Sequence, residues 1–66
     1  MLGVREAADV SAAALRAVAA CLHWLLSEPA PAVLRCHYAT ARGEVWAALD
    51  CLVRAVRHLD EWEARR

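Results

Sequence analysis

The first part of the chain places apolar residues at alternating intervals of four and three positions. Such a heptad pattern puts its members on one face of an α-helix. The members are Val4, Ala8, Ser11, Leu15, Val18, Leu22 and Leu25, among which Ser11 is small rather than apolar. The opposite face carries four polar residues, Arg5, Asp9, Arg16 and His23. The spacing therefore predicts an amphipathic helix over about residues 4–26.

Two prolines separate this helix from the next one. Pro29 and Pro31 have no backbone N–H to donate, and each pushes the residue before it out of the helical conformation. Pro31 suits the first turn of a following helix, where an N–H has no partner in any case. We therefore expect a turn over about residues 27–30 and a second helix that begins at about residue 31.

A second apolar stripe follows without a break in phase. At about 100° per residue, its members stay within roughly 40° of one direction on a helix. They are Leu34, Tyr38, Ala41, Val45, Leu49, Leu52, Val56 and Leu59. Gly43 lies inside the stripe without resetting its phase, and no capping residue stands beside it, so the pattern predicts one long helix over about residues 31–63. The alternative is a three-helix chain that bends at residues 41–43.

The composition indicates a single small, folded, all-α domain. Apolar residues make up 61% of the 66 residues, which is enough buried surface to offset the entropy of folding and excludes disorder. Eight arginines balance eight acidic residues, and the chain has no lysine. With zero net charge there is no overall field to attract nucleic acid or an anionic membrane, so we expect neither as a partner.

The three cysteines, Cys21, Cys36 and Cys51, indicate a reducing compartment. An odd number cannot form a closed set of disulfides, and no Cys-x-x-Cys pair is present, so we expect a cytoplasmic protein. Cys21 and Cys51 are expected as small buried residues and Cys36 as a surface thiol. Residues 7–26 have the length of a membrane span, but Arg16 would lie near the bilayer midplane at a cost of about 2.5 kcal/mol or more.

The two helices are expected to pair as an antiparallel hairpin that forms a homodimer. A turn near Pro29 places Leu22 opposite His37, and Val4 opposite Ala55, each within about one turn. Both apolar arcs are wider than one partner helix can cover, so two hairpins should form a four-helix bundle. Its expected core is Leu15, Val18, Leu22, Leu25, Tyr38, Val45, Leu49, Leu52, Val56 and Leu59.

The sequence offers no convincing site for chemistry. His37, Glu44, Cys51 and His58 recur at seven-residue intervals and are all types of metal ligand. Seven residues advance about 10 Å along a helix, so no two of these side chains on one helix could share an ion. No nucleophile with a base, carboxylate pair or phosphate-binding loop has a credible spacing. We therefore expect no metal, no cofactor and no enzymatic activity.

Tryptophan and arginine dominate the energetics of protein interfaces, and they point to a binding function. The expected partner-binding residues are Trp62, Trp46, Arg42, Arg35 and Trp24. Trp62 is the leading candidate because it is predicted to lie beyond the end of the first helix. The sequence thus favours a dimeric adaptor, accessory subunit or inhibitor that binds another protein. The alternatives are a small dimeric DNA-binding regulator and a minimal enzyme with an Arg/Glu anion pocket at the dimer interface.

Overall fold

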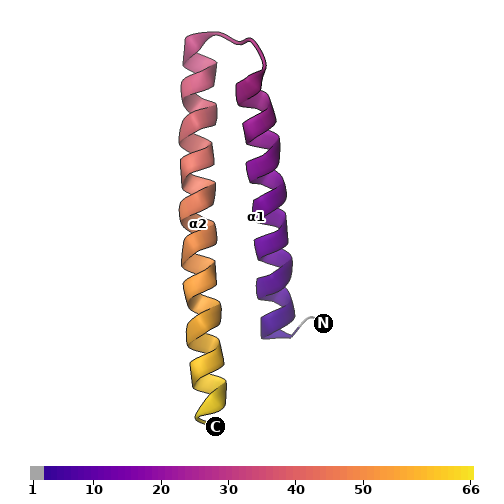
Figure 1. The fold of residues 1–66 in the computed structure, drawn as a ribbon, viewed down its shortest axis with the longest axis vertical. Coiled ribbons are helices and arrows are strands. Elements are labelled where there is room, and N and C mark those ends of the chain that lie inside the picture. The colour runs from indigo at the N-terminus through magenta and orange to yellow at the C-terminus, as the bar shows by residue number, and fades with distance from the viewer. Residues whose placement is uncertain (1–2) are drawn as a thin grey trace.

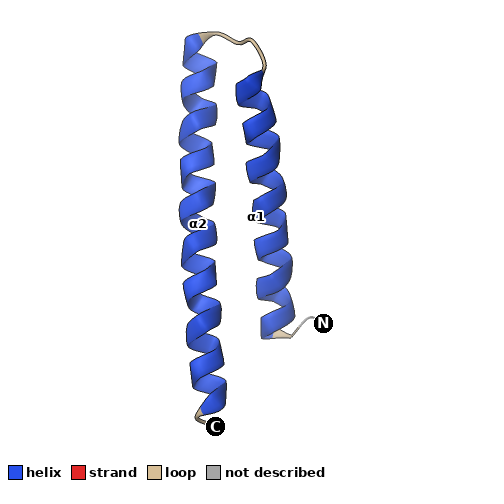
Figure 2. Ribbon diagram, viewed as in Figure 1, coloured by secondary structure: helices blue, strands red, loops and turns tan. Residues whose placement is uncertain are grey.

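Two long α-helices joined by a short loop make up the described part of the chain, residues 3–66, in this computed structural model (Figure 1). Helix α1 spans Val4–Ser27 and helix α2 spans Ala32–Ala64. They run antiparallel as a hairpin (Figure 2). The bounds lie within one residue of those that the spacing predicts, and the all-α hairpin is confirmed.

The loop is extended because its prolines leave it no helical alternative. Glu28 (φ −86°, ψ 148°) and Pro31 (φ −57°, ψ 147°) both have extended backbones. The Ser27 hydroxyl donates to the Trp24 carbonyl at 2.6 Å, and the Arg35 guanidinium donates to the Glu28 carbonyl at 3.1 Å. The first bond lies within the last turn of α1, and the second ties the loop to the first turn of α2. The Glu28 N–H ties the loop to α1 by donating to the Leu25 carbonyl at 3.3 Å.

Helix α2 continues through Gly43 without interruption. No residue in the described range has a positive φ, so Gly43 is an ordinary helical position. The alternative of a third helix after a bend at residues 41–43 is therefore wrong. The continuous phase of the apolar stripe was the correct guide, because a glycine inside a helix costs about 1 kcal/mol and does not by itself end it.

The hairpin has a thin core. Only Ala19 and Leu49 are buried among the described residues, with 4% and 7% of their surface exposed. Half-buried residues continue the two stripes: Ala8, Ala12, Leu15, Leu22, Leu25 and Leu26 on α1, and Tyr38, Ala41, Arg42, Val45, Leu52, Val56 and Leu59 on α2. Val18, expected in the core, is 46% exposed. Ala12 and Ala19 face α2 in its place, since their small side chains let the two helices approach closely.

The register differs from the expected one by five to six residues, or about one and a half turns. Arg5 pairs with Asp60, which places the start of α1 beside residues near Asp60 rather than beside Ala55. The extended loop is the cause, because it carries α2 past the end of α1 before the helix begins (Figure 1). Helix α2 consequently projects beyond α1 at both ends of the hairpin, and not only at its C-terminal end.

The hairpin has two long faces of opposite character, each crossing both helices. The charged face consists of Arg5, Asp9, Arg16, His23, Arg42, Trp46, Val53 and Asp60. The apolar face consists of Val4, Ser11, Val18 and Leu25 from α1 and Leu34, Ala41, Ala48, Ala55, Leu59 and Trp62 from α2. The spacing predicted that the polar stripe of α1 lies opposite the helix–helix contact. In the structure this stripe lies beside the contact instead.

Candidate functional site

A groove on the charged face gathers three basic side chains and a tryptophan. It has a volume of about 500 Å³ and is lined by Arg16, Ala19, Ala20, His23, Arg42 and Trp46; we call it the arginine groove. Arg42 is half-buried, whereas Arg16, His23 and Trp46 are exposed. Within residues 3–66, neither Arg16 nor Arg42 forms an ion pair. The groove therefore carries arginines that form no ion pair within the described hairpin, although Asp9 lies on the same face near Arg16.

Ion pairs occupy the other end of the same face. Arg5 of α1 pairs with Asp60 and lies 3.7 Å from a carboxylate oxygen of Glu63. These are the contacts between charged groups that link α1 to α2 in the described part of the chain. On the charged face, ion pairs therefore link the two helices at the open end of the hairpin, which is the end away from the loop. In the middle of the face, Arg16 and Arg42 form no ion pair with any described residue.

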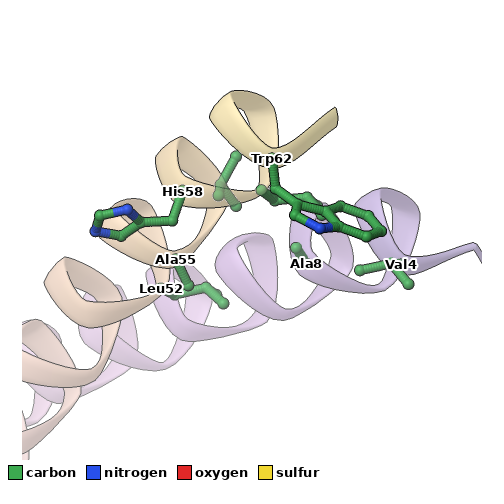
Figure 3. Close-up of a pocket in the computed structure, with 8 residues that line it drawn as sticks. Val4, Ala8, Leu52, Ala55, His58 and Trp62 are labelled. Atoms are coloured by element: carbon green, nitrogen blue, oxygen red, sulfur yellow. The ribbon is translucent and has the colours of Figure 1, made fainter. Parts of the chain in front are cut away.

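A second groove, at the open end of the apolar face, is almost entirely hydrophobic. It has a volume of about 480 Å³, and we call it the terminal groove; its lining is Val4, Ala8, Leu52, Ala55, Val56, His58, Leu59 and Trp62. Figure 3 shows the Trp62 ring lying toward Val4, while His58 points away from it. His58 lies 3.6 Å from a carboxylate oxygen of Glu61 instead.

The position of Trp62 therefore differs from the expected one, which was beyond the end of α1 with few partners in its own chain. Its indole shares the terminal groove with Val4 and Ala8, and the Arg66 guanidinium stands 4.8 Å from the centre of its ring. The shifted register is the reason, because it brings the start of α1 closer to the end of α2. Even so, 55% of the surface of Trp62 stays exposed.

The other predicted partner-binding residues do not form one site. Trp46 and Arg42 meet in the arginine groove. Trp24 is exposed on the outer side of α1, where it lines a shallow depression with Ala20, Cys21 and Leu25. Arg35 is placed at the loop by its hydrogen bond to Glu28. The structure therefore separates the five candidates, which include Trp62, into four places.

The regular series of possible metal ligands is also spread out. In the described part of the chain, no three His, Cys, Asp or Glu side chains gather closely enough to hold an ion. Cys21, Cys36 and Cys51 are free and exposed. The expectation that Cys21 and Cys51 are buried is wrong, because two helices bury only the stripe where they touch.

Sequence reasoning did not include Arg16 and His23 among the partner-binding residues, since both were assigned to the polar face of the first helix. The signal that could have found them is their position relative to the buried residues. Arg16 lies three positions before Ala19, and His23 lies four positions after it. On a helix these are neighbouring positions, so both side chains border the contact with α2.

Comparison with protein-family models, with curated proteins and with solved structures finds no match for this chain. One general feature of α1 bears on location: the helix is long and apolar enough to cross a membrane. Core helices of soluble proteins and signal sequences share that property.

Proposed function

We propose that this protein is a non-enzymatic protein–protein interaction module that works as a homodimeric four-helix bundle. It would act in the cytoplasm as an adaptor, accessory subunit or inhibitor, by binding and covering a surface of a partner protein. The observation that carries the proposal is the large surface that the hairpin leaves uncovered.

That surface exceeds what a compact chain of this size exposes. The accessible area is 5091 Å² for a mass of 7.3 kDa, whereas a compact folded monomer of that mass exposes about 4200 Å². The radius of gyration is 15.5 Å, against about 11 Å for a compact chain of this length. The excess of about 900 Å² is close to the roughly 800 Å² that each partner buries in a standard interface.

The apolar face is the surface that supports self-association. It carries exposed Val4, Val18, Leu34 and Trp62 and no ion pair between the helices. Small helical chains rarely reach a stable fold without added burial, a metal or disulfides. A second hairpin on this face would cover these side chains and build the bundle core.

The charged face supports recognition of a different protein. When the apolar face is covered by a second hairpin, the arginine groove stays on the outside of the bundle. Arg42 and Trp46 are of the residue types that carry most of the energy in protein interfaces. The unpaired positive charge of Arg16 and Arg42 selects a partner segment that brings a carboxylate beside an apolar side chain.

The two alternative functions have less support. An Arg/Glu anion pocket would need Arg35, Arg42 and Glu44 to converge, but Arg35 bonds the loop and the arginine groove does not include Glu44. A DNA-binding regulator would need a wide basic surface, whereas the basic side chains of the arginine groove number three and Arg5 is paired with acids.

A cytoplasmic location is also part of the proposal. Arg16 lies near the middle of α1, where a membrane span would place it in the bilayer core at a cost of about 2.5 kcal/mol or more. The test is fractionation of the source cells: the protein should stay in the supernatant after high-speed centrifugation. Retention in the membrane pellet after a high-salt wash would contradict this location.

The assembly is tested by light scattering coupled to size exclusion in reducing buffer, with far-ultraviolet circular dichroism on the same sample. The expected result is a helical dimer. A helical monomer at micromolar concentration would contradict the homodimer.

The partner surface is tested by comparing three forms of the protein as affinity baits in 0.15 M and 0.5 M salt. We expect the wild type and the control Arg57→Ala to retain one protein that the double variant Arg42→Ala/Trp46→Ala loses. A parallel titration with duplex DNA should show no binding at 0.15 M salt. Specific DNA binding that weakens steeply with salt would favour the regulator instead.

A further inference from the structure

Along each helix, the residues of the apolar face that repeat every seven positions are arranged symmetrically about a central point. From this pattern we infer how the second copy binds: it packs on the apolar face turned end for end, with the two loops at opposite ends of the bundle. The two-fold axis then crosses α1 between Ala14 and Leu15 and crosses α2 at Ala48. This inference rests on the homodimer of the proposed function and specifies its geometry.

On α2 the apolar face repeats at seven-residue intervals. The repeat consists of Leu34, Ala41, Ala48, Ala55 and Trp62. Leu59, the remaining member of the apolar face on α2, is half-buried beside α1 and lies outside this repeat. Inversion about Ala48 exchanges Leu34 with Trp62 and Ala41 with Ala55. Two α2 helices related in this way would approach closely at their three alanines. Near each end, the Trp62 ring would pack on Leu34 of the partner subunit. Leu34 is 42% exposed in the hairpin, so it has surface to bury in this contact.

On α1 the same face also repeats at seven-residue intervals. Its members are Val4, Ser11, Val18 and Leu25. Inversion about the midpoint between Ala14 and Leu15 exchanges Val4 with Leu25 and Ser11 with Val18. Each pair would then combine two apolar side chains or one apolar and one small side chain. The stripe of α1 is therefore as compatible with a second, inverted copy of itself as the stripe of α2 is.

The two centres of inversion lie at nearly the same level of the hairpin, although each is defined by the residues of its own helix alone. The arginine groove sets Ala20 beside Arg42 and Trp46, and the ion pair sets Arg5 beside Asp60. Between these two levels, the midpoint of the α1 stripe lies beside about residues 49–50 of α2. The centre of the α2 stripe, Ala48, is within two residues of that level, or about 3 Å. One axis can thus pass through both centres.

The lengths of the helices favour this arrangement over a dimer with both loops at the same end. In the latter, α2 would face α1 of the partner subunit, which has 24 residues against its own 33. Helix α2 projects past α1 at the loop (Figure 1), and Leu34 lies in the first turn of α2, so it would remain uncovered. In the inverted arrangement α2 faces an equal helix, and Ala48 is the midpoint of Ala32–Ala64.

The polar flank of α2 fits the same axis. His37, Glu44, Cys51 and His58 also repeat every seven residues and invert about nearly the same point. His37 would lie beside His58 of the partner subunit, and Glu44 would lie beside Cys51 of the partner subunit. At the rim of the interface histidine would therefore meet histidine, and the Glu44 carboxylate would meet the small thiol of Cys51 rather than a large apolar side chain.

The geometry is tested by disulfide trapping in a chain whose three exposed native cysteines are changed to serine. Circular dichroism and light scattering under reducing conditions first establish that this background is a helical dimer. Ala48→Cys is then added, and oxidation should link most of the chains as a covalent dimer. A residue on the axis meets its own copy at the short Cα separation that a disulfide needs. Ala47→Cys, on the outer side of α2, is the matched control and should cross-link at least about tenfold more slowly.

A second pair of variants tests the axis away from its centre. Ala41→Cys and Ala55→Cys should cross-link when mixed and should not cross-link separately. Conversely, cross-linking of mixed Ala14→Cys and Ala48→Cys chains, with Ala48→Cys alone inert, would place the loops at the same end and overturn the inference. A dimer without the Ala48→Cys link also overturns it and leaves the proposed homodimer intact. A monomeric wild type would contradict both the homodimer and the inverted geometry inferred for it.

Discussion

The two long faces of the hairpin are built from the same two helices, yet they differ in what completes them. The charged face is partly complete within one chain, because Arg5 joins α1 to Asp60 of α2. The apolar face has no such link and leaves Val4, Leu34 and Trp62 exposed. A hairpin can satisfy charges in water at its own edge, but it needs another surface to remove apolar side chains from water.

The largest expected effect comes from placing a charge on the apolar side of the contact. Leu52 is half-buried between the helices, where it lines both the terminal groove and a pocket of the charged face, so Leu52→Glu puts a carboxylate into the helix–helix contact. We expect a destabilisation of about 3 kcal/mol or more, with loss of the dimer and of most helicity. Light scattering and circular dichroism measure both.

The neighbouring residue supplies the control for that variant. Val53 is exposed and lines the charged face near Arg16. Val53→Glu should therefore keep the helicity and mass of the wild type. If Leu52→Glu behaved like Val53→Glu, the two faces would not differ in the way described.

A second comparison removes one tryptophan from each face. Trp62→Ala should raise the dissociation constant of the homodimer by about 30-fold, which corresponds to about 2 kcal/mol at a central interface tryptophan. Trp46→Ala, in the arginine groove, should leave that constant within about threefold of the wild type. Sedimentation equilibrium over a range of concentrations gives both values. Equal effects would mean that the homodimer also uses the charged face.

A substitution on neither face should strengthen the helix without altering assembly. A Cβ added at Gly43 would meet no atom within 4 Å, and the residue is helical. Gly43→Ala should therefore raise the free energy of unfolding by about 1 kcal/mol per chain. Urea unfolding followed by circular dichroism measures it. A fall in stability would show that the assembled bundle brings another surface against residue 43.

The smallest effect concerns the link on the charged face. Arg5→Ala removes the ion pair with Asp60 and should cost about 0.2–1 kcal/mol, because both side chains are about half exposed. The difference from the wild type should largely disappear in 0.5 M salt, where such charges are screened. Urea unfolding at low and high salt tests this. A loss of more than 2 kcal/mol that is independent of salt would contradict it.

The helices could be predicted from the sequence because their signals are local. The heptad spacing and the two prolines determine where α1 and α2 begin and end, and the phase across Gly43 indicates a single α2. The ion pairs between Asp50 and Arg54 and between Glu61 and Arg65 follow from another local signal, the four-residue spacing of opposite charges on a helix. Arg57 and Glu61 have the same spacing but form no ion pair in the described part of the chain.

The packing was harder to predict because it depends on side-chain size and on the loop. The preference for large apolar residues selected Val18 for the core, where the close approach of the helices places Ala19. The register of the two helices depends on the length that the extended loop spans before α2 begins. The spacing of apolar residues in the sequence does not determine that length. The position of Trp62 and the membership of the arginine groove followed from that register.

The thin core has a consequence for the life of the newly made chain. With only Ala19 and Leu49 buried in the described hairpin, a single copy has little to hold it closed against local opening. The proposed homodimer would hold it closed, so its resistance to proteases and its melting temperature should rise with protein concentration. A cell that makes few copies would degrade most of them before they meet, so the amount of functional protein would increase more steeply than its rate of synthesis.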